Sequence, residues 1–262
     1  NNMRVALTFD AEHPDRPHHL VGSEDRLRET LGSLEVRVTF FVQGRWAEAF
    51  PDQARRIAED GHLIGNHSHY HAKMNLLTEA GLMEDIKAAA GAIETICKRD
   101  PAPWFRSPFG AGANDPRVRA ALDRLGYRQV LWSATGDDWD HRETAQHMED
   151  AAVESTRAHG DGAILLFHTW PSYTHEKIAR IVARLRDEGA TFVTVDDLDQ
   201  KEIPDNFGEI DWAEFQQVIS GNGPCNHERL AARRAAHEDG AWVRAAAAAY
   251  AAKQASKSTE AA

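Results

Sequence analysis

Short apolar segments alternate with longer amphipathic segments along most of this chain, and this alternation constrains the fold more than any other feature. Apolar segments rich in β-branched and aromatic residues predict strands at residues 3–9, 36–42, 62–64, 128–133, 163–167 and 191–195. Helical periodicity predicts helices at residues 24–34, 47–60, 78–99, 117–125, 142–158 and 175–188. Strands that alternate with helices of about 10–15 residues are typical of an α/β fold with a parallel sheet, either open or barrel-like.

The alternation ends near Asp199, and the remaining sequence has a different composition. Residues 201–262 are rich in alanine, with a run from Ala245 to Ala249. Alanine favours helix, but it leaves few large side chains to bury. We therefore expect one α/β domain over residues 1–200 and a C-terminal extension over residues 201–262 that is helical or partly disordered.

Charge and hydropathy exclude several classes of protein. The chain has 30 basic and 41 acidic side chains, which gives a formal net charge of −11. Nucleic acids and anionic membrane surfaces select for a basic face, so we expect no nucleic acid and no membrane as partner. No apolar run approaches the roughly 18 residues of a membrane helix, and the N-terminus enters a strand pattern at once. We expect a cytoplasmic protein, or a secreted one if a signal peptide has been removed.

Five polar motifs follow the apolar segments in order. They are TFDAE at 8–12, HSHYH at 67–71, FRSPFG at 105–110, WSATGDDW at 132–139 and LLFH at 165–168. Active sites of α/β folds gather at the C-terminal ends of parallel strands. Because the motifs share that position, we expect their polar side chains to converge on one rim of the sheet. Each motif alone is also typical of an ordinary cap, turn or surface loop.

Histidine is more frequent than phenylalanine or tryptophan, with 14 in the chain, and it ligates metals and transfers protons near neutral pH. His67 and His71 have the i, i+4 spacing that on a helical turn places both imidazoles on one face toward one ion. His168 ends a predicted buried strand, where a titratable imidazole is a candidate acid or base. On spacing alone, a metal site and ordinary structural histidines both stay open.

With these five motifs in this order, residues 3–198 resemble the polysaccharide deacetylases, the NodB homology domain of carbohydrate esterase family four. TFDAE is similar to the family's Thr-Phe-Asp-Asp-Gly motif, HSHYH to His-Ser/Thr-x-x-His, and FRSPFG to Arg-x-Pro-Tyr/Phe-Gly. WSATGDDW resembles the family's segment ending in Asp-Trp, and LLFH resembles its Leu-x-His motif. The resemblance implies that the catalytic domain is a distorted (β/α) barrel.

The resemblance also implies a divalent ion, most often zinc, with His67 and His71 as ligands. Such an ion would polarise an acetamide carbonyl and lower the pKa of a bound water toward about 7. Asp10 would be the general base that takes a proton from this water, and Arg106 would hold the Asp10 carboxylate in place.

One departure from the family's pattern concerns the acidic metal ligand. Ala11 stands at the position of the family's second Asp and cannot ligate a metal. Side chains at i and i+2 of a strand end share a face. Glu12 can therefore reach the same ion whose bound water would give its proton to Asp10. We therefore expect Glu12 as the third ligand. Asp10 itself, or His13 entering the coordination shell, are the alternatives.

The remaining motifs imply the groups that meet the substrate. By the resemblance, His168 would protonate the leaving amine, and Asp138 would set the orientation and pKa of its imidazole. The backbone N–H of Phe109 would help to stabilise the oxyanion. Trp139 and Trp170, which lie beside the motifs, are the preferred candidates for stacking on a sugar ring.

The expected activity is therefore metal-dependent removal of N-acetyl groups, by hydrolysis of a linear C–N amide bond, from an amino sugar. The substrate would be a chitooligosaccharide, peptidoglycan or a related glycan. Because the first motif is altered, an amidase of the same fold that acts on a non-carbohydrate small molecule is the alternative. A binding module without catalysis is the third hypothesis, and the intact Asp10, His67, His71, Arg106 and His168 argue against it.

Overall fold

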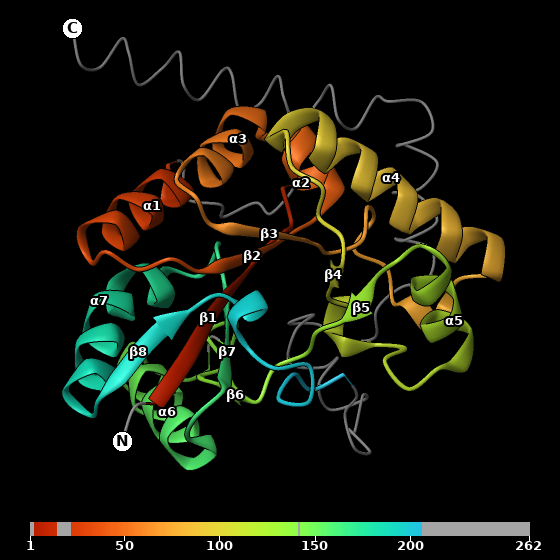
Figure 1. The fold of residues 1–262 in the computed structure, drawn as a ribbon. Coiled ribbons are helices and arrows are strands. Elements are labelled where there is room, and N and C mark those ends of the chain that lie inside the picture. The colour runs from red at the N-terminus through yellow and green to blue at the C-terminus, as the bar shows by residue number, and fades with distance from the viewer. Residues whose placement is uncertain (1–2, 15–21, 141, 206–262) are drawn as a thin grey trace, which may run out of the picture.

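The computed structural model describes residues 3–14, 22–140 and 142–205 (Figure 1). In this part of the chain eight parallel strands form one sheet in the order β5–β4–β3–β2–β1–β7–β6, and β8 also pairs with β1. The strands are β1 (Met3–Ala11), β2 (Thr39–Val42), β3 (Leu63–Asn66), β4 (Trp104–Phe105), β5 (Arg128–Gln129), β6 (Ala134–Thr135), β7 (Ala163–His168) and β8 (Ala190–Val193).

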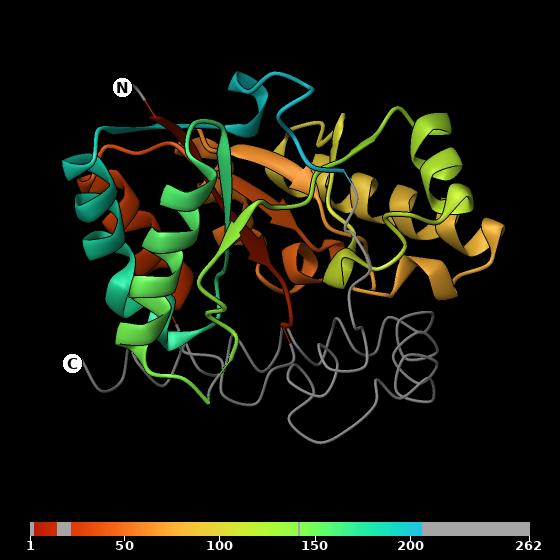
Figure 2. The same ribbon diagram turned by 90° about the horizontal axis from the view of Figure 1, so that it is seen from below.

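Helices cover the outside of the sheet. They are α1 (Ser23–Ser33), α2 (Gly44–Ala49), α3 (Pro51–Glu59), α4 (Glu79–Cys97), α5 (Pro116–Arg124), α6 (Ala145–His159) and α7 (Ser172–Asp187). Three short 3-10 helices lie in the loops after β3, β4 and β8: η1 (Met74–Leu76), η2 (Pro108–Gly110) and η3 (Val195–Asp197). Helices α1, α6 and α7 group on one side of the sheet, and α4 and α5 lie at the opposite side, as the two views show (Figure 1 and Figure 2).

The central strand β1 determines which side chains meet at the rim. Its residues 3–6 pair with β8, its residues 8–11 pair with β2, and its residues 5–10 pair with β7 along the other edge. Strands covered on both faces are nearly continuously apolar, which explains the short apolar run at residues 3–9. The β1–β7 register places Asp10 opposite His168, so two of the predicted catalytic residues lie side by side.

An aromatic stack lies behind this rim in the core. The ring of Phe9 is 5.4 Å from that of Phe40 and 5.5 Å from that of Phe167, measured between centroids, and all three side chains are fully buried. Since side chains alternate along a strand, Phe9 points into the core while Asp10 points to the other face. The stack therefore fixes three neighbouring strands just below the polar rim.

The predicted α/β class is confirmed, because the parallel strands and outer helices form a half-barrel. Within the described residues β5 and β6 end the sheet on its two sides and do not pair with each other. The helix predicted at 78–99 is α4, and Thr78 caps it by accepting the backbone N–H of Gly81 at 3.1 Å. Among the described helices none has both the length and the apolar character needed to span a membrane.

Two predicted elements differ from the structure. The single helix predicted at 47–60 is divided into α2 and α3 at Phe50, because Pro51 lacks the N–H that a continuous helix needs and starts a new helix instead. The strand predicted at 128–133 is only the two-residue β5. Strands β4 and β6 were not predicted, since two residues are too short to show a period.

Most of the predicted C-terminal extension, residues 206–262, lies outside the described residues. Residues 201–205 return to the domain: the backbone N–H of Leu131 donates to the carbonyl of Pro204 at 2.8 Å. Arg119 also pairs with Asp205, with 2.7 Å between Nη2 and Oδ2. A domain boundary at residue 200 stays a prediction.

Candidate active site

The polar side chains of all five motifs converge at the C-terminal ends of the strands. Asp10 and Glu12 lie at the end of β1, the histidine loop follows β3, Arg106 follows β4 and His168 ends β7. Hydrogen bonds and ion pairs connect the predicted residues, which are Asp10, Glu12, His67, His71, Arg106, Asp138 and His168. The predicted convergence on one rim is therefore what the structure has.

The Asp10 carboxylate is fixed by a fully buried guanidinium. Nη1 of Arg106 donates to Oδ1 of Asp10 and to Oγ1 of Thr8, each at 2.9 Å. Nε and Nη2 donate to the carbonyls of Val130 and Leu131, each at 3.0 Å. All three guanidinium nitrogens thus have partners in the chain, so Arg106 cannot swing away and holds Asp10 in one orientation.

His67 has one nitrogen committed to the backbone. Its Nδ1 lies 2.8 Å from the carbonyl oxygen of Arg106, and a carbonyl only accepts, so Nδ1 carries the proton. Its Nε2 lies 3.0 Å from Oε2 of Glu12 and 3.4 Å from Oδ2 of Asp10. Burial alone lowers the pKa of His67, but these two carboxylates outweigh it and raise the pKa. The contact between Nε2 and Oε2 therefore requires either a second proton or a cation between the two atoms.

Glu12 is a buried carboxylate between imidazoles. Its Oε2 contacts Nε2 of both His67 and His71, and the whole residue is 3% exposed. Burial alone raises the pKa of the Glu12 carboxyl, but the imidazoles around it, His71 first, hold the pKa well below its usual range. Burial lowers the pKa of His71 to about 4, which favours the neutral imidazole that binds metals.

The loop that carries both histidines is not helical, so the helical turn on which their i, i+4 spacing would place them on one face is not formed there. Ser68 and His71 adopt left-handed backbone angles, with φ of 65° and 54°, which interrupt any helix. The Asp85 carboxylate of α4 accepts two backbone N–H groups of the loop, at 3.1 and 3.0 Å. The irregular backbone is therefore held by a buried side chain, and it brings His67 and His71 to Glu12 without helical geometry.

On the other side of Asp10, His168 is paired with an acid. Its Nδ1 lies 2.8 Å from Oδ1 of Asp138, and Thr174 donates to Oδ2 of the same carboxylate at 2.5 Å. Burial by itself lowers the pKa of His168, but the charge and hydrogen bond of Asp138 raise the pKa to about 9. The imidazole is therefore protonated at neutral pH, as a proton donor must be.

Of the three residues predicted to meet the substrate, Phe109 and Trp170 contact this cluster, and Trp139 directly follows one of its members. Phe109, in η2, has a left-handed φ of 60°, and its ring centroid is 4.7 Å from that of His71. Trp139 is half-buried and follows Asp138 directly. Trp170 is 6% exposed, and its Nε1 donates to Oε1 of Glu12 at 3.1 Å. Stacking of a sugar on Trp139 or Trp170 stays a prediction.

Besides Asp85, sequence reasoning missed two further polar residues that support the site. Gln43 accepts the backbone N–H of His13 at 3.0 Å and donates to the carbonyl of His69 at 3.2 Å. Gln43 directly follows the C-terminal end of β2. The other motifs were identified because they follow strand ends, so the same criterion could have identified Gln43. Thr174, the partner of Asp138, lies within α7 and carries no such signal.

The side chains present fit a divalent cation. Two groups have ligand atoms within 4.8 Å of one another, namely Glu12 with His13 and His71, and Glu12 with Asp10 and His67. Two histidines and one glutamate are a donor set of catalytic zinc. The backbone hydrogen bond of His67 at Nδ1 is also the usual support of a ligating imidazole. Glu12 belongs to both groups. This favours Glu12 as the acidic ligand that Ala11, at the position of the family's second Asp, cannot provide.

Comparisons with known proteins agree with this geometry. The sequence model described as polysaccharide deacetylase matches residues 1–130. A chitooligosaccharide deacetylase of Azorhizobium caulinodans is 32% identical over 170 residues, which cover 64% of this chain and 74% of that protein. The peptidoglycan-N-acetylmuramic acid deacetylase PdaA of Bacillus subtilis is 28% identical over 196 residues, or 74% of this chain and 70% of that one.

Among solved structures, a mutant of a CE4 family pseudoenzyme from Bacillus anthracis, with restored enzymatic activity, superposes with a TM-score of 0.66. The two chains are 25% identical, and the match covers 76% of this chain and 68% of the other. Together with the match to most of the chitooligosaccharide deacetylase and the ordered motifs on one rim, these similarities establish that the chain belongs to the polysaccharide deacetylase family, carbohydrate esterase family four.

Proposed function

We propose that this protein is a metal-dependent deacetylase that removes N-acetyl groups from an amino sugar of a glycan. The observation that carries the proposal is the placement of a base and an acid on paired strands. Asp10, held by Arg106, lies opposite His168 in the β1–β7 register, and beside them Oε2 of Glu12 contacts Nε2 of His67 and of His71. Amide hydrolysis needs this combination, because one group must take a proton and another must give one.

The residues divide the reaction between them. A divalent ion held by Glu12, His67 and His71 would polarise the carbonyl and lower the pKa of water. Asp10 takes the proton of the attacking water, and Arg106 keeps its carboxylate aimed at that water. The C–N bond of the acetamide then breaks, His168 gives its proton to the leaving nitrogen, and the products are acetate and a free amine.

A glycan substrate is supported by the named relatives, which are deacetylases of peptidoglycan and of chitooligosaccharides. The net charge of −11 favours a neutral or cationic ligand over a strongly anionic polymer. The family's chemistry is thus proposed for N-acetylated glycans such as chitooligosaccharides and peptidoglycan fragments.

Two other functions each have one observation in their favour. Ala11 at the position of the family's acidic ligand favours an amidase that acts on a non-carbohydrate small molecule. The similarity to a pseudoenzyme favours a binding module. The pairing of Asp10 with Arg106 and of His168 with Asp138 argues against a binding module, since such a module needs neither an oriented base nor an oriented acid.

The experiment that tests the proposal measures acetate release from chitooligosaccharides and from peptidoglycan fragments. The protein is stripped with a chelator and then assayed with and without added zinc. We expect release from a glycan only after zinc is restored. If no sugar yields acetate but a small acylated amide does, the small-molecule amidase is correct. If the protein retains metal yet hydrolyses no amide, it is a binding module.

A further inference from the structure

We propose that Trp170 and His13 are positioning residues for Glu12. Their two N–H groups hold one carboxylate oxygen, Oε1, and thereby leave the other oxygen to face the two ligating imidazoles. The inference rests on the proposed function only in taking Glu12 as a metal ligand. It explains how a glutamate can serve where the family's motif has an aspartate one residue earlier.

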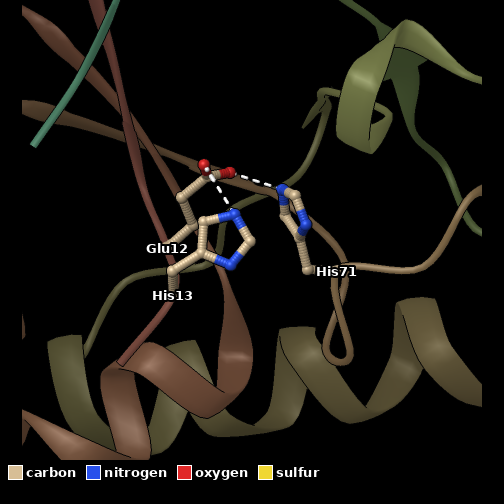
Figure 3. Close-up of side chains that lie close together, drawn as sticks. All are labelled: Glu12, His13 and His71. Carbon is tan, nitrogen blue, oxygen red and sulfur yellow. Dashed lines mark ion pairs between the residues drawn. The ribbon is translucent and has the colours of Figure 1, made fainter. Parts of the chain in front are cut away.

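The two oxygens of Glu12 have separate surroundings. Oε1 lies 3.1 Å from Nε1 of Trp170 and 3.2 Å from Nε2 of His13. Oε2 lies 3.0 Å from Nε2 of His67 and contacts Nε2 of His71. Figure 3 shows one oxygen of the Glu12 carboxylate paired with the ring of His13 and the other oxygen paired with the ring of His71. The carboxylate is thus oriented before any ion arrives.

Such orientation matters because a glutamate has one more rotatable bond than an aspartate. A carboxylate with both oxygens free can turn away from an ion or bind it through either oxygen. Hydrogen-bond donors to Oε1 restrict the Glu12 carboxylate to one arrangement. Hydrogen-bond partners of a metal ligand strongly affect metal affinity. The indole N–H of Trp170 is suited to this task, because it is a donor only and cannot compete for the ion.

The backbone of His13 is held in the conformation that this contact needs. His13 has a left-handed φ of 56°, which is uncommon for residues other than glycine and is found at functional sites. Gln43 accepts the His13 backbone N–H and donates to the carbonyl of His69. One amide therefore ties the turn after Glu12 to the loop that carries His67 and His71.

Trp170 is held in place from the neighbouring strand. The backbone N–H of Thr169, the preceding residue, donates to the carbonyl of Asp10 at 3.1 Å. The Trp170 ring lies 5.5 Å from that of His168 and 6.3 Å from that of His13, between centroids. The indole is therefore anchored to the strand of the proton donor while its N–H reaches across to Glu12.

The test measures zinc affinity of the full chain by competition with a chromophoric chelator. Trp170→Phe removes the indole N–H, and His13→Ala removes the imidazole. We expect each to weaken zinc binding by about 10- to 100-fold, and His13→Gln, which keeps an N–H donor, to stay within a few-fold of the native protein. Trp46→Phe is the matched control, because Trp46 is also buried, in α2, and its Nε1 has no hydrogen-bond partner to lose among the described residues; its zinc affinity should be native.

X-ray absorption at the zinc edge separates positioning from ligation. Two imidazole ligands are expected in both the native protein and His13→Ala. Three imidazoles in the native protein and two in the variant would make His13 a ligand and overturn the inference. Native zinc affinity in Trp170→Phe and His13→Ala, or an equal loss in Trp46→Phe, would also overturn it. Zinc affinities that follow the expected pattern in a protein that releases no acetate would overturn the proposed function alone.

Discussion

Nδ1 of His168 lies 2.8 Å from Oδ1 of Asp138, and Oδ2 of the same carboxylate accepts the His168 backbone N–H at 2.7 Å. One acid therefore fixes both the ring and the backbone of His168, the proposed proton donor. Burial alone would deprotonate the imidazole at neutral pH, and the Asp138 charge reverses this by raising the pKa of His168 to about 9.

Asp138→Asn should move the alkaline limb of the pH profile of kcat to lower pH. Without the negative charge, burial dominates and the pKa of His168 falls, so the protonated form is lost at lower pH. At pH 8 we expect kcat to fall by about 100-fold or more, as for loss of a general acid. Asp150→Asn, on the exposed surface of α6, is the control. An unchanged limb in Asp138→Asn would show that His168 is not the titrating donor.

His62 should make the protein less stable in acid. Burial lowers the pKa of His62 to about 4, and its Nδ1 accepts the backbone N–H of Val38 at 3.3 Å, which requires the neutral ring. The unfolded chain has a pKa of about 6.5 and binds the proton first. The stabilisation is therefore complete above pH 6.5 and is lost as pH falls toward 4, by roughly 2–3 kcal/mol at pH 4.5.

Urea unfolding at pH 7 and pH 4.5 checks this expectation. His62→Asn keeps an acceptor but does not titrate, so its free energy of unfolding should fall less between the two pH values than that of the native protein. His147→Asn, at an exposed position of α6, should behave as the native protein does. An equal fall in native protein and His62→Asn would assign the acid sensitivity to other groups.

Gly136→Ala should destabilise the contact between β6 and α6. A Cβ at Gly136 would lie 2.5 Å from the carbonyl oxygen of Met148 and 2.9 Å from Cβ of Ala152, so the helix must move. We expect the free energy of unfolding to fall by about 1–3 kcal/mol, as for overpacked cores. Gly91→Ala is the matched control in α4, where a Cβ meets nothing within 4 Å. The higher helix propensity of alanine should raise the free energy of unfolding of this variant by at most about 1 kcal/mol. Equal urea midpoints for the two variants would contradict this packing.

Much of the fold could be predicted because hydrophobic period and strand-end position are local properties. The buried strand at residues 163–167 and the amphipathic helix at 78–99 stand out from sequence alone, and both are present. Strands β4 and β6 have two residues each and depend on the neighbouring strands for their pairing. Pairing with a strand that is distant in the chain cannot be inferred from the local sequence.

Which polar side chains meet at the rim could be predicted from the sequence, but the contacts between them could not. Position after strands identified Asp10, Glu12 and His168. The i, i+4 spacing of the histidines places them on one face only on a helical turn, whereas their loop is irregular and is held by Asp85 of α4. The bond from Trp170 to Glu12 joins residues 158 positions apart, so only the folded sheet reveals it.

The division of labour between Asp10 and Glu12 is tested most directly by measuring bound zinc and acetate release together in two variants. Glu12→Ala should lose zinc, because the two imidazoles are left without their acidic partner. Asp10→Asn should keep native zinc content while acetate release falls by at least about 100-fold. Loss of zinc from Asp10→Asn, with zinc retained in Glu12→Ala, would contradict the account and make Asp10 the acidic ligand.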